Sequence, residues 1–99
     1  MLKMDRVGAG EVRLDGRLDA VEAPAAQAFL DGVAGTVTLD CGALEYISSA
    51  GLGVLLKTHK RLAGAAGGLR LVGVSPHLRD IFRYSGFDQI FQIEPVRPR

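Results

Sequence analysis

Residues 36–74 read TVTLDCGALEYISSAGLGVLLKTHKRLAGAAGGLRLVGV, and the change of hydrophobic period within this stretch decides the fold. Residues 36–41 form a short run rich in β-branched side chains, which predicts a central strand. From residue 52 to residue 63 the apolar side chains recur at helical spacing, and residues 69–74 again have the pattern of a strand. A strand, a helix and a strand joined by short connections favour parallel pairing through a crossover. The stretch therefore predicts an α/β fold.

The segment before this stretch predicts an edge hairpin and a helix. Residues 3–18 alternate apolar and charged side chains around a glycine-rich turn at residues 8–10, the pattern of two half-buried strands. Residues 19–35 predict a helix that carries Pro24 in its first turn. Residues 42–47 predict a connection between the central strand and the long helix.

The segment after the stretch predicts one more helix and one more strand. Ser75 and Pro76 have the residue types preferred at the N-cap and at the first helical position. Residues 90–93 predict a last short strand. We therefore expect a single α/β domain over residues 1–99, with a mixed, mainly parallel sheet, flanking helices and the hairpin at one edge.

Composition limits the classes of function. The chain is 47% apolar and 23% charged, as in ordinary globular proteins. Residues 1–50 carry four basic and eight acidic side chains, a net −4, whereas residues 51–99 carry eight basic and three acidic, a net +5. This asymmetry is too weak for nucleic-acid binding. No apolar stretch approaches the ~20 residues of a membrane span, and no secretory signal is visible. We expect a cytoplasmic protein without membrane insertion or a nucleic-acid partner.

Catalytic and metal-binding signatures are missing from the sequence. Cys41, His59 and His77 lack the spacing of zinc ligands, and no phosphate-binding loop is present. We expect Cys41 to be a small buried side chain, His59 a packed helix residue and His77 a surface residue. Residues 49–51 resemble the end of a nucleophile elbow, but Ile47 replaces its first glycine. The sequence therefore predicts no enzyme, no cofactor and no metal.

A pair of hydroxyl residues, Ser48 and Ser49, precedes the long apolar helix. One of them is expected to be the N-cap, which accepts a backbone N–H that would otherwise lack a partner. The other hydroxyl then lies at a helix N-terminus, where the helix dipole and free amides favour a phosphate. A partner docked on the same loop would instead meet the added negative charge. The pattern fits a phosphorylation switch.

Several motifs resemble the STAS domain family, and especially the bacterial anti-sigma factor antagonists. They cover nearly the whole chain, in order: GRLD at residues 16–19, TLD at 38–40, YISSAGLGVLL at 46–56, LRLVGVSP at 69–76 and IFRYSGFD at 81–88. The resemblance implies partner switching. In that family the unphosphorylated antagonist binds a serine kinase of the GHKL type that is also an anti-sigma factor. Phosphorylation releases the antagonist, and a phosphatase of the PP2C type resets it.

The family's loop reads Asp-Ser-Ser/Thr-Gly, with the acceptor serine two residues before the glycine. Counting back from Gly51 implies Ser49 as the acceptor. The family's aspartate is replaced by Ser48, which makes Ser48 a competing acceptor, and the second hydroxyl residue is replaced by Ala50.

The resemblance also implies a binding surface on the loop and the exposed side of the following helix. The expected contact residues are Ser48, Ser49, Ala50, Gly51, Gly53, Val54, Lys57 and Arg61. Val54 is the expected exposed aliphatic contact, because small residues flank it. We expect Asp19 to cap its helix or lie near the loop, and Asp40 to order the serine loop by hydrogen bonding. The alternatives are a STAS scaffold subunit docked on an ABC transporter ATPase in lipid trafficking, and a small-molecule or nucleotide binder.

Overall fold

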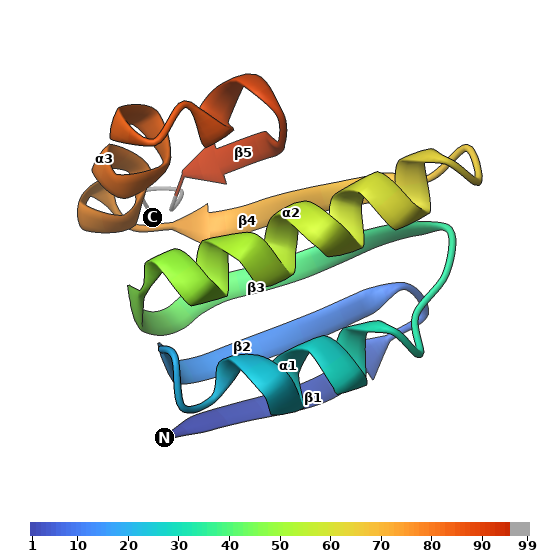
Figure 1. Ribbon diagram of the computed structural model, residues 1–99, viewed down its shortest axis with the longest axis horizontal. Helices are drawn as coiled ribbons and strands as arrows, with labels where there is room; N and C mark the ends of the chain where they lie inside the picture. The colour runs from blue at the N-terminus through green and yellow to red at the C-terminus, as the bar shows by residue number, and fades with distance from the viewer. Residues whose placement is uncertain (96–99) are drawn as a thin grey trace.

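The computed structural model describes residues 1–95 and consists of a five-stranded sheet with helices (Figure 1). The elements along the chain are β1 (Leu2–Gly8), β2 (Glu11–Leu18), α1 (Ala23–Leu30), β3 (Thr36–Ile47), α2 (Ser49–Ala63), β4 (Gly68–Val74), α3 (Pro76–Tyr84), the 3-10 helix η1 (Phe87–Gln89) and β5 (Gln92–Pro95).

The strands lie in the order β1-β2-β3-β4-β5. β1 pairs antiparallel with β2, and every other neighbouring pair is parallel. The predicted mixed, mainly parallel α/β sheet with an N-terminal edge hairpin is therefore confirmed. Because β2, β3 and β4 are parallel, the segments that follow them lie together at the carboxyl ends of the strands. These segments are the turn before α1, the start of α2 and the start of α3.

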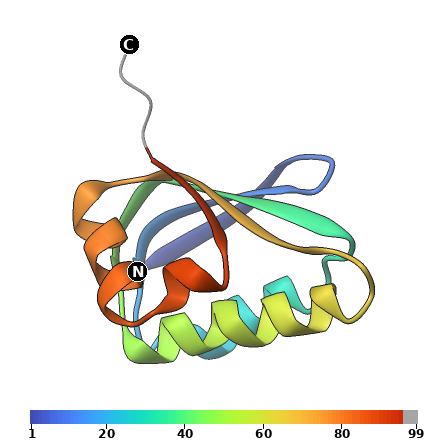
Figure 2. The same ribbon diagram turned by 90° about the horizontal axis from the view of Figure 1, so that it is seen from above.

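The helices lie on one side of the sheet, as the second view shows (Figure 2). Alternate residues of β2 point into the core below, where Val12, Leu14 and Leu18 are buried. Residues on the other face of β2 are exposed and charged. There Arg13 pairs with Asp40 of β3 at 3.4 Å. The alternation predicted for the first hairpin thus separates a core face from an open, polar face.

The predicted connection at residues 42–47 is wrong, because β3 continues to Ile47. Leu44 and Ile47 are both buried although they are three residues apart, because the pairing with β2 shifts register between Leu44 and Tyr46. Residues 43–47 pair with residues 15–18 of β2, and one register shift precedes this stretch of the ladder while a second lies within it. β4 accompanies β3 only as far as Asp40, so the second half of β3 has a partner on one side.

Helix α1 is shorter than the predicted 19–35. At its start the Asp19 carboxylate accepts the N–H groups of Val21 and Glu22, at 3.1 and 3.0 Å, and fixes a turn before the helix. At its end the N–H of Val33 bonds to the carbonyl of Leu30 at 3.2 Å, and the chain turns away. The turn before α1 therefore lies at the carboxyl ends of the strands, where the serine loop also lies.

The predicted last strand at residues 90–93 is displaced, since β5 begins at Gln92. Phe91 does not extend the strand, because its N–H donates to the Phe87 carbonyl at 3.1 Å. Its ring is buried in the core. The ring contacts Phe82, Phe87 and His59 edge-on, with centroid distances of 6.3, 5.7 and 5.3 Å. The part of the tail at residues 96–99 lies outside the described residues.

His59 joins helix α2 to the start of β4. Its Nδ1 accepts the N–H of Leu69 at 3.1 Å, and its ring packs against Phe91. We expect His59→Leu to lower the free energy of unfolding by about 1–3 kcal/mol, because a part-buried N–H loses its acceptor. His59→Asn keeps an acceptor and should retain part of the difference. Urea unfolding of the two variants checks this, and equal stabilities would contradict it.

Cys41 is a buried side chain in β3, as predicted. Burial, with a smaller contribution from the charge of Asp40, raises the pKa of the thiol from 9.0 to about 12. The folded state therefore retains the thiol proton between these values, while the unfolded state loses it, so stability falls as pH rises through this window. At pH 8 we expect a thiol reagent to leave the folded protein unmodified and to react once urea unfolds it. Rapid labelling without denaturant would contradict this.

Candidate functional site

The two serines have separate structural roles at the start of α2. Ser48 is the N-cap, with extended backbone, and its Oγ accepts the N–H of Gly51 at 3.2 Å. Its carbonyl accepts the N–H of Leu52 at 2.8 Å. Ser49 is the first helical residue and is exposed. The hydroxyl that caps the helix and the hydroxyl that faces solvent are therefore on different residues.

The serine loop is held against the end of β2. The N–H of Ser48 donates to the carbonyl of Leu18 at 2.9 Å, and Leu18 pairs with Ile47 in the parallel ladder. Gly51 lies directly over this junction and is buried. A Cβ on Gly51 would lie 2.6 Å from the Leu18 carbonyl oxygen and 2.8 Å from Ile47 Cγ1. Gly51 therefore permits the close approach of helix to sheet and does not itself face a partner, contrary to its predicted contact role.

One stripe of α2 remains available at the surface. Ser49, Gly53 and Lys57 follow at intervals of four residues and so lie on one side of the helix. Ser49, Ala50 and Lys57 are exposed, and a Cβ on Gly53 would meet no atom within 4 Å. These four residues retain the exposure that their predicted contact role needs.

The prediction that Val54 is an exposed aliphatic contact is wrong, since only 6% of Val54 is exposed. The reason is that a second side of α2 packs against α1. Thr58, one turn after Val54, is fully buried; its hydroxyl donates to the Val54 carbonyl at 2.8 Å and accepts from Gln27 Nε2 of α1 at 3.3 Å. The periodicity identified one buried side of this helix and missed the other.

The guanidinium of Arg61 is likewise occupied within the fold. It donates to the carbonyls of Leu30 and Val33, at 2.8 and 2.7 Å. These carbonyls lie at and beyond the end of α1, where the helix leaves acceptors without intrahelical partners. The expectation that Arg61 offers its charge to a partner is therefore not supported by its position.

Of the two carboxylates predicted to support the serine loop, Asp19 lies beside it and Asp40 does not. Asp19 does not cap α1, because the N-cap of that helix is Glu22 and the helix has no side-chain cap. Its carboxylate instead fixes the turn before α1, directly after Leu18, whose carbonyl holds Ser48 of the serine loop. Asp40 does not order the loop, because β3 runs seven residues beyond it. Its carboxylate instead accepts the N–H of Gly42 at 2.9 Å and pairs with Arg13.

An exposed residue that sequence reasoning missed is Val21, whose exposed fraction is 85%. It belongs to the turn after β2, adjacent in the sheet to the serine loop after β3. The predicted parallel pairing could have located Val21, because the segments that follow neighbouring parallel strands lie side by side. Because residues 19–35 were predicted to be helical, no turn was expected at Val21.

The described residues 1–95 offer little for catalysis around Ser49. His59 is ten residues further along α2, about 15 Å at the helical rise, and its Nδ1 is occupied by Leu69. Among the residues described, no three His, Cys, Asp or Glu side chains gather to hold a metal. None of the described helices has both the length and the hydropathy to cross a bilayer.

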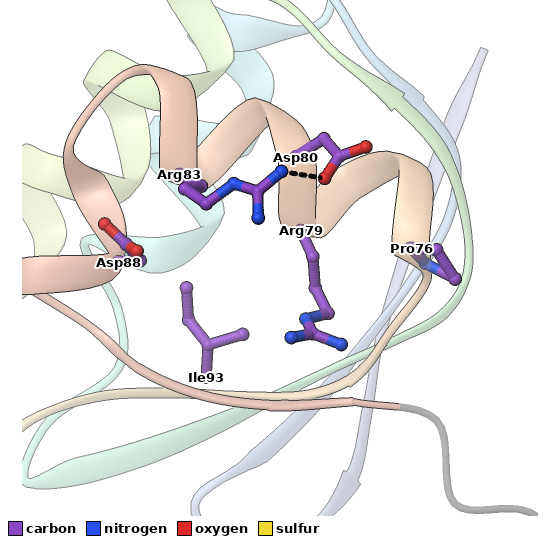
Figure 3. Close-up of a pocket in the computed structure, with 6 residues that line it drawn as sticks. All are labelled: Pro76, Arg79, Asp80, Arg83, Asp88 and Ile93. Atoms are coloured by element: carbon purple, nitrogen blue, oxygen red, sulfur yellow. Dashed lines mark hydrogen bonds and ion pairs between the residues drawn. The ribbon is translucent and has the colours of Figure 1, made fainter.

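A hollow of about 380 Å³ lies elsewhere, between α3, η1 and β5 (Figure 3). Its lining residues are Pro76, Arg79, Asp80, Arg83, Asp88 and Ile93. The charges of Arg83 and Asp80 pair at 3.0 Å. None of these residues belongs to the serine loop or to α2, so the hollow is separate from Ser49.

A helix layer on one side of a mainly parallel five-stranded sheet, with an antiparallel hairpin at one edge, defines a small mixed α/β domain. The family model described as "Mlab, STAS domain" matches residues 4–95. The chain therefore belongs to the STAS domain family.

Its relatives include anti-sigma factor antagonists. BtrV of Bordetella bronchiseptica, whose name assigns it provisionally to that class, is 48% identical over 61 residues, or 62% of this chain and 53% of BtrV. The chain thus spans about half the length of this relative. The anti-sigma F factor antagonist of Lysinibacillus sphaericus is 34% identical over 80 residues, covering 76% of this chain and 68% of that protein.

The fold also matches a solved structure of the same class. The crystal structure of an anti-sigma factor antagonist from Mycobacterium paratuberculosis superposes with a TM-score of 0.78 at 27% identity. The match covers 96% of this chain and 85% of that one.

Proposed function

We propose that the protein is an anti-sigma factor antagonist that works by partner switching in the cytoplasm. In this proposal the unphosphorylated form binds an anti-sigma factor that is also a serine kinase of the GHKL type, and phosphorylation of Ser49 ends the binding. A PP2C-type phosphatase restores the binding form. The observation that carries the proposal is the division between the two serines: Ser48 caps the helix, while Ser49 is exposed and free to be modified.

The start of α2 is suited to hold a phosphate on Ser49. The N–H groups of Gly51 and Leu52 bond to Ser48, whereas those of Ser49 and Ala50 have no acceptor within the helix. Two free amides and the positive end of the helix dipole stabilise an anion at this position. Phosphorylation is therefore expected to leave the fold intact.

The same phosphate would oppose a docked partner. We define the serine surface as Ser49, Ala50, Gly53, Lys57 and Val21. Its small residues leave the helix backbone accessible, and Val21 supplies the apolar contact that Val54, being buried, cannot. A dianion inside such a contact must lose water or face like charge. An unfavourable free energy of about 3 kcal/mol, in the range for misplaced interface charge, weakens binding roughly hundredfold.

Titration of the unphosphorylated protein with the anti-sigma kinase of the same organism, without ATP, tests the proposal. We expect a saturable complex, and we expect substitution of Val21 by Asp to weaken it. The competing function is a scaffold subunit on an ABC transporter ATPase. A stable complex with that ATPase, together with no detectable affinity for the kinase, would overturn the proposal.

A further inference from the structure

The first strand leaves one edge of the sheet unpaired. β1 (Leu2–Gly8) is the outermost strand of the five, and within residues 1–95 only β2 pairs with it. The opposite edge strand, β5, has four residues and includes Pro95, whereas β1 has seven residues and no proline. A free edge of this length presents backbone donors and acceptors on which another strand can pair.

The hydrogen bonding of β1 to β2 identifies which backbone groups of β1 point away from the sheet. The Met1 carbonyl accepts the N–H of Arg17 at 2.9 Å, so Met1 directs its polar groups toward β2. The direction of the backbone polar groups alternates along an antiparallel pair, so the N–H and C=O groups of Lys3 and Asp5 also point toward β2. Leu2, Met4 and Arg6 therefore direct their N–H and C=O groups outward, away from the sheet.

The charges of β1 select one register for pairing with a second copy. An antiparallel pair of identical strands is symmetric about one residue. Symmetry about Lys3 or about Asp5 places like charges directly opposite each other, and symmetry about Arg6 does the same. Symmetry about Met4 places Lys3 opposite Asp5 of the second copy, and Asp5 opposite its Lys3. Opposite charges in directly facing positions stabilise a strand pair, and like charges destabilise it.

The same register also brings the outward backbone groups of the two copies together. It sets Met4 opposite Met4 and Leu2 opposite Arg6, so the outward N–H and C=O groups of each copy meet those of the other. Within one chain the Lys3 ammonium and the Asp5 carboxylate form an ion pair at 3.7 Å, and both side chains are more than half exposed, so the pair is weak and can exchange partners. Both charges are therefore available to a partner.

We propose that two copies of this chain pair through β1, antiparallel and symmetric about Met4, to form one continuous sheet. The occupant of the edge is thus a second copy, chosen by the alternating charges of Lys3 and Asp5. Ser49 follows β3, which is two strands in from this edge, so the pairing does not involve α2. The inference rests on β1 alone and is independent of phosphorylation.

Sedimentation velocity at protein concentrations from about 10 μM to about 1 mM, where weak interfaces assemble, tests the pairing. We expect the wild-type chain to form dimers in this range. Lys3→Asp and Asp5→Lys should each raise the dimer Kd about tenfold or more, because two attractive pairs become repulsive. The double variant Lys3→Asp/Asp5→Lys restores opposite charges across the interface, and we expect it to dimerise like the wild type.

Arg79→Asp on α3 is the control, since it also changes an exposed charge but lies away from β1. It should leave the dimer Kd unchanged, and circular dichroism should confirm that every variant is folded. A monomer at all concentrations would overturn the proposal. A dimer that is indifferent to both single reversals, or that the double variant fails to restore, would overturn it equally.

Discussion

Ser49→Asp is expected to weaken binding of the anti-sigma kinase about a hundredfold. The substitution places a permanent charge on the exposed first residue of α2, at the centre of the proposed serine surface. The fold should tolerate it, because acidic residues are favourable in the first turn of a helix. The docked partner should not, because the charge must be desolvated on binding. Isothermal titration with the kinase, without ATP, measures the difference.

Ser49→Asn is the matched control for that experiment. Asn has the size and shape of Asp without its charge, so we expect its affinity to stay within a few-fold of the wild-type value. Equal affinities of the Asp and Asn variants would show that charge at this residue does not govern binding. A loss in both variants would indicate that the shape of the serine loop, and not a charge, is recognised.

Gly51→Ala is expected to lower the free energy of unfolding by about 1–3 kcal/mol, the usual range for overpacking a close contact. The added Cβ would lie 2.6 Å from the carbonyl oxygen of Leu18. That oxygen already accepts the N–H of Ser48, so it cannot move without disturbing the serine loop. Each kcal/mol corresponds to about 4–8 °C in Tm for a domain of this size. Thermal and urea unfolding measure the effect.

Gly53→Ala, two residues further along the same helix, provides the control. Its Cβ would meet no atom within 4 Å, so only the helical propensity changes. We expect this variant to be more stable than wild type by about 0.5–1 kcal/mol. Opposite signs for the two substitutions support the close packing of Gly51 over β2. A stabilising Gly51→Ala would contradict it.

The arrangement of the elements could be predicted because local patterns and tertiary structure agree. The alternation in residues 3–18 gave an edge hairpin, and Ser75 with Pro76 marked the start of α3, where Ser75 Oγ accepts the N–H of Leu78 at 3.3 Å. The order strand, helix, strand predicted parallel pairing, and the sheet confirms it. These features depend on a few neighbouring residues, so a single sequence is sufficient to find them.

The features that were missed depend on contacts between distant segments. Residues 42–47 form a strand because β2 pairs with them, although Gly42 and Ala43 have little strand propensity. Val54 is buried because α1 packs beside α2, and Arg61 is occupied because the end of α1 lies within its reach. Neither fact can be derived from the pattern of α2 alone.

The site was predictable in part for the same reason. The position of Ser49 before a helix gave it a candidate role, but its spacing could not decide which serine is the cap. That decision depends on the extended backbone of Ser48 and its bond to Gly51. Val21 escaped notice because it approaches the serine loop only through the pairing of β2 with β3.

The proposed switch requires that Ser49, and not its neighbour Ser48, receives the phosphate. Ser48→Ala removes the cap and should lower stability by about 1 kcal/mol, yet it leaves the Ser49 hydroxyl in place. Ser49→Ala should keep the cap and lose the acceptor. The two variants therefore separate stability from modification at adjacent residues.

The most direct measurement is to incubate the wild-type protein and both variants with the anti-sigma kinase and ATP, and to locate the phosphate by peptide mass spectrometry. We expect phosphate on Ser49 in the wild-type protein and in Ser48→Ala, and none in Ser49→Ala. Phosphate on Ser48, or undiminished phosphorylation of Ser49→Ala, would contradict the assignment of Ser49 as the acceptor.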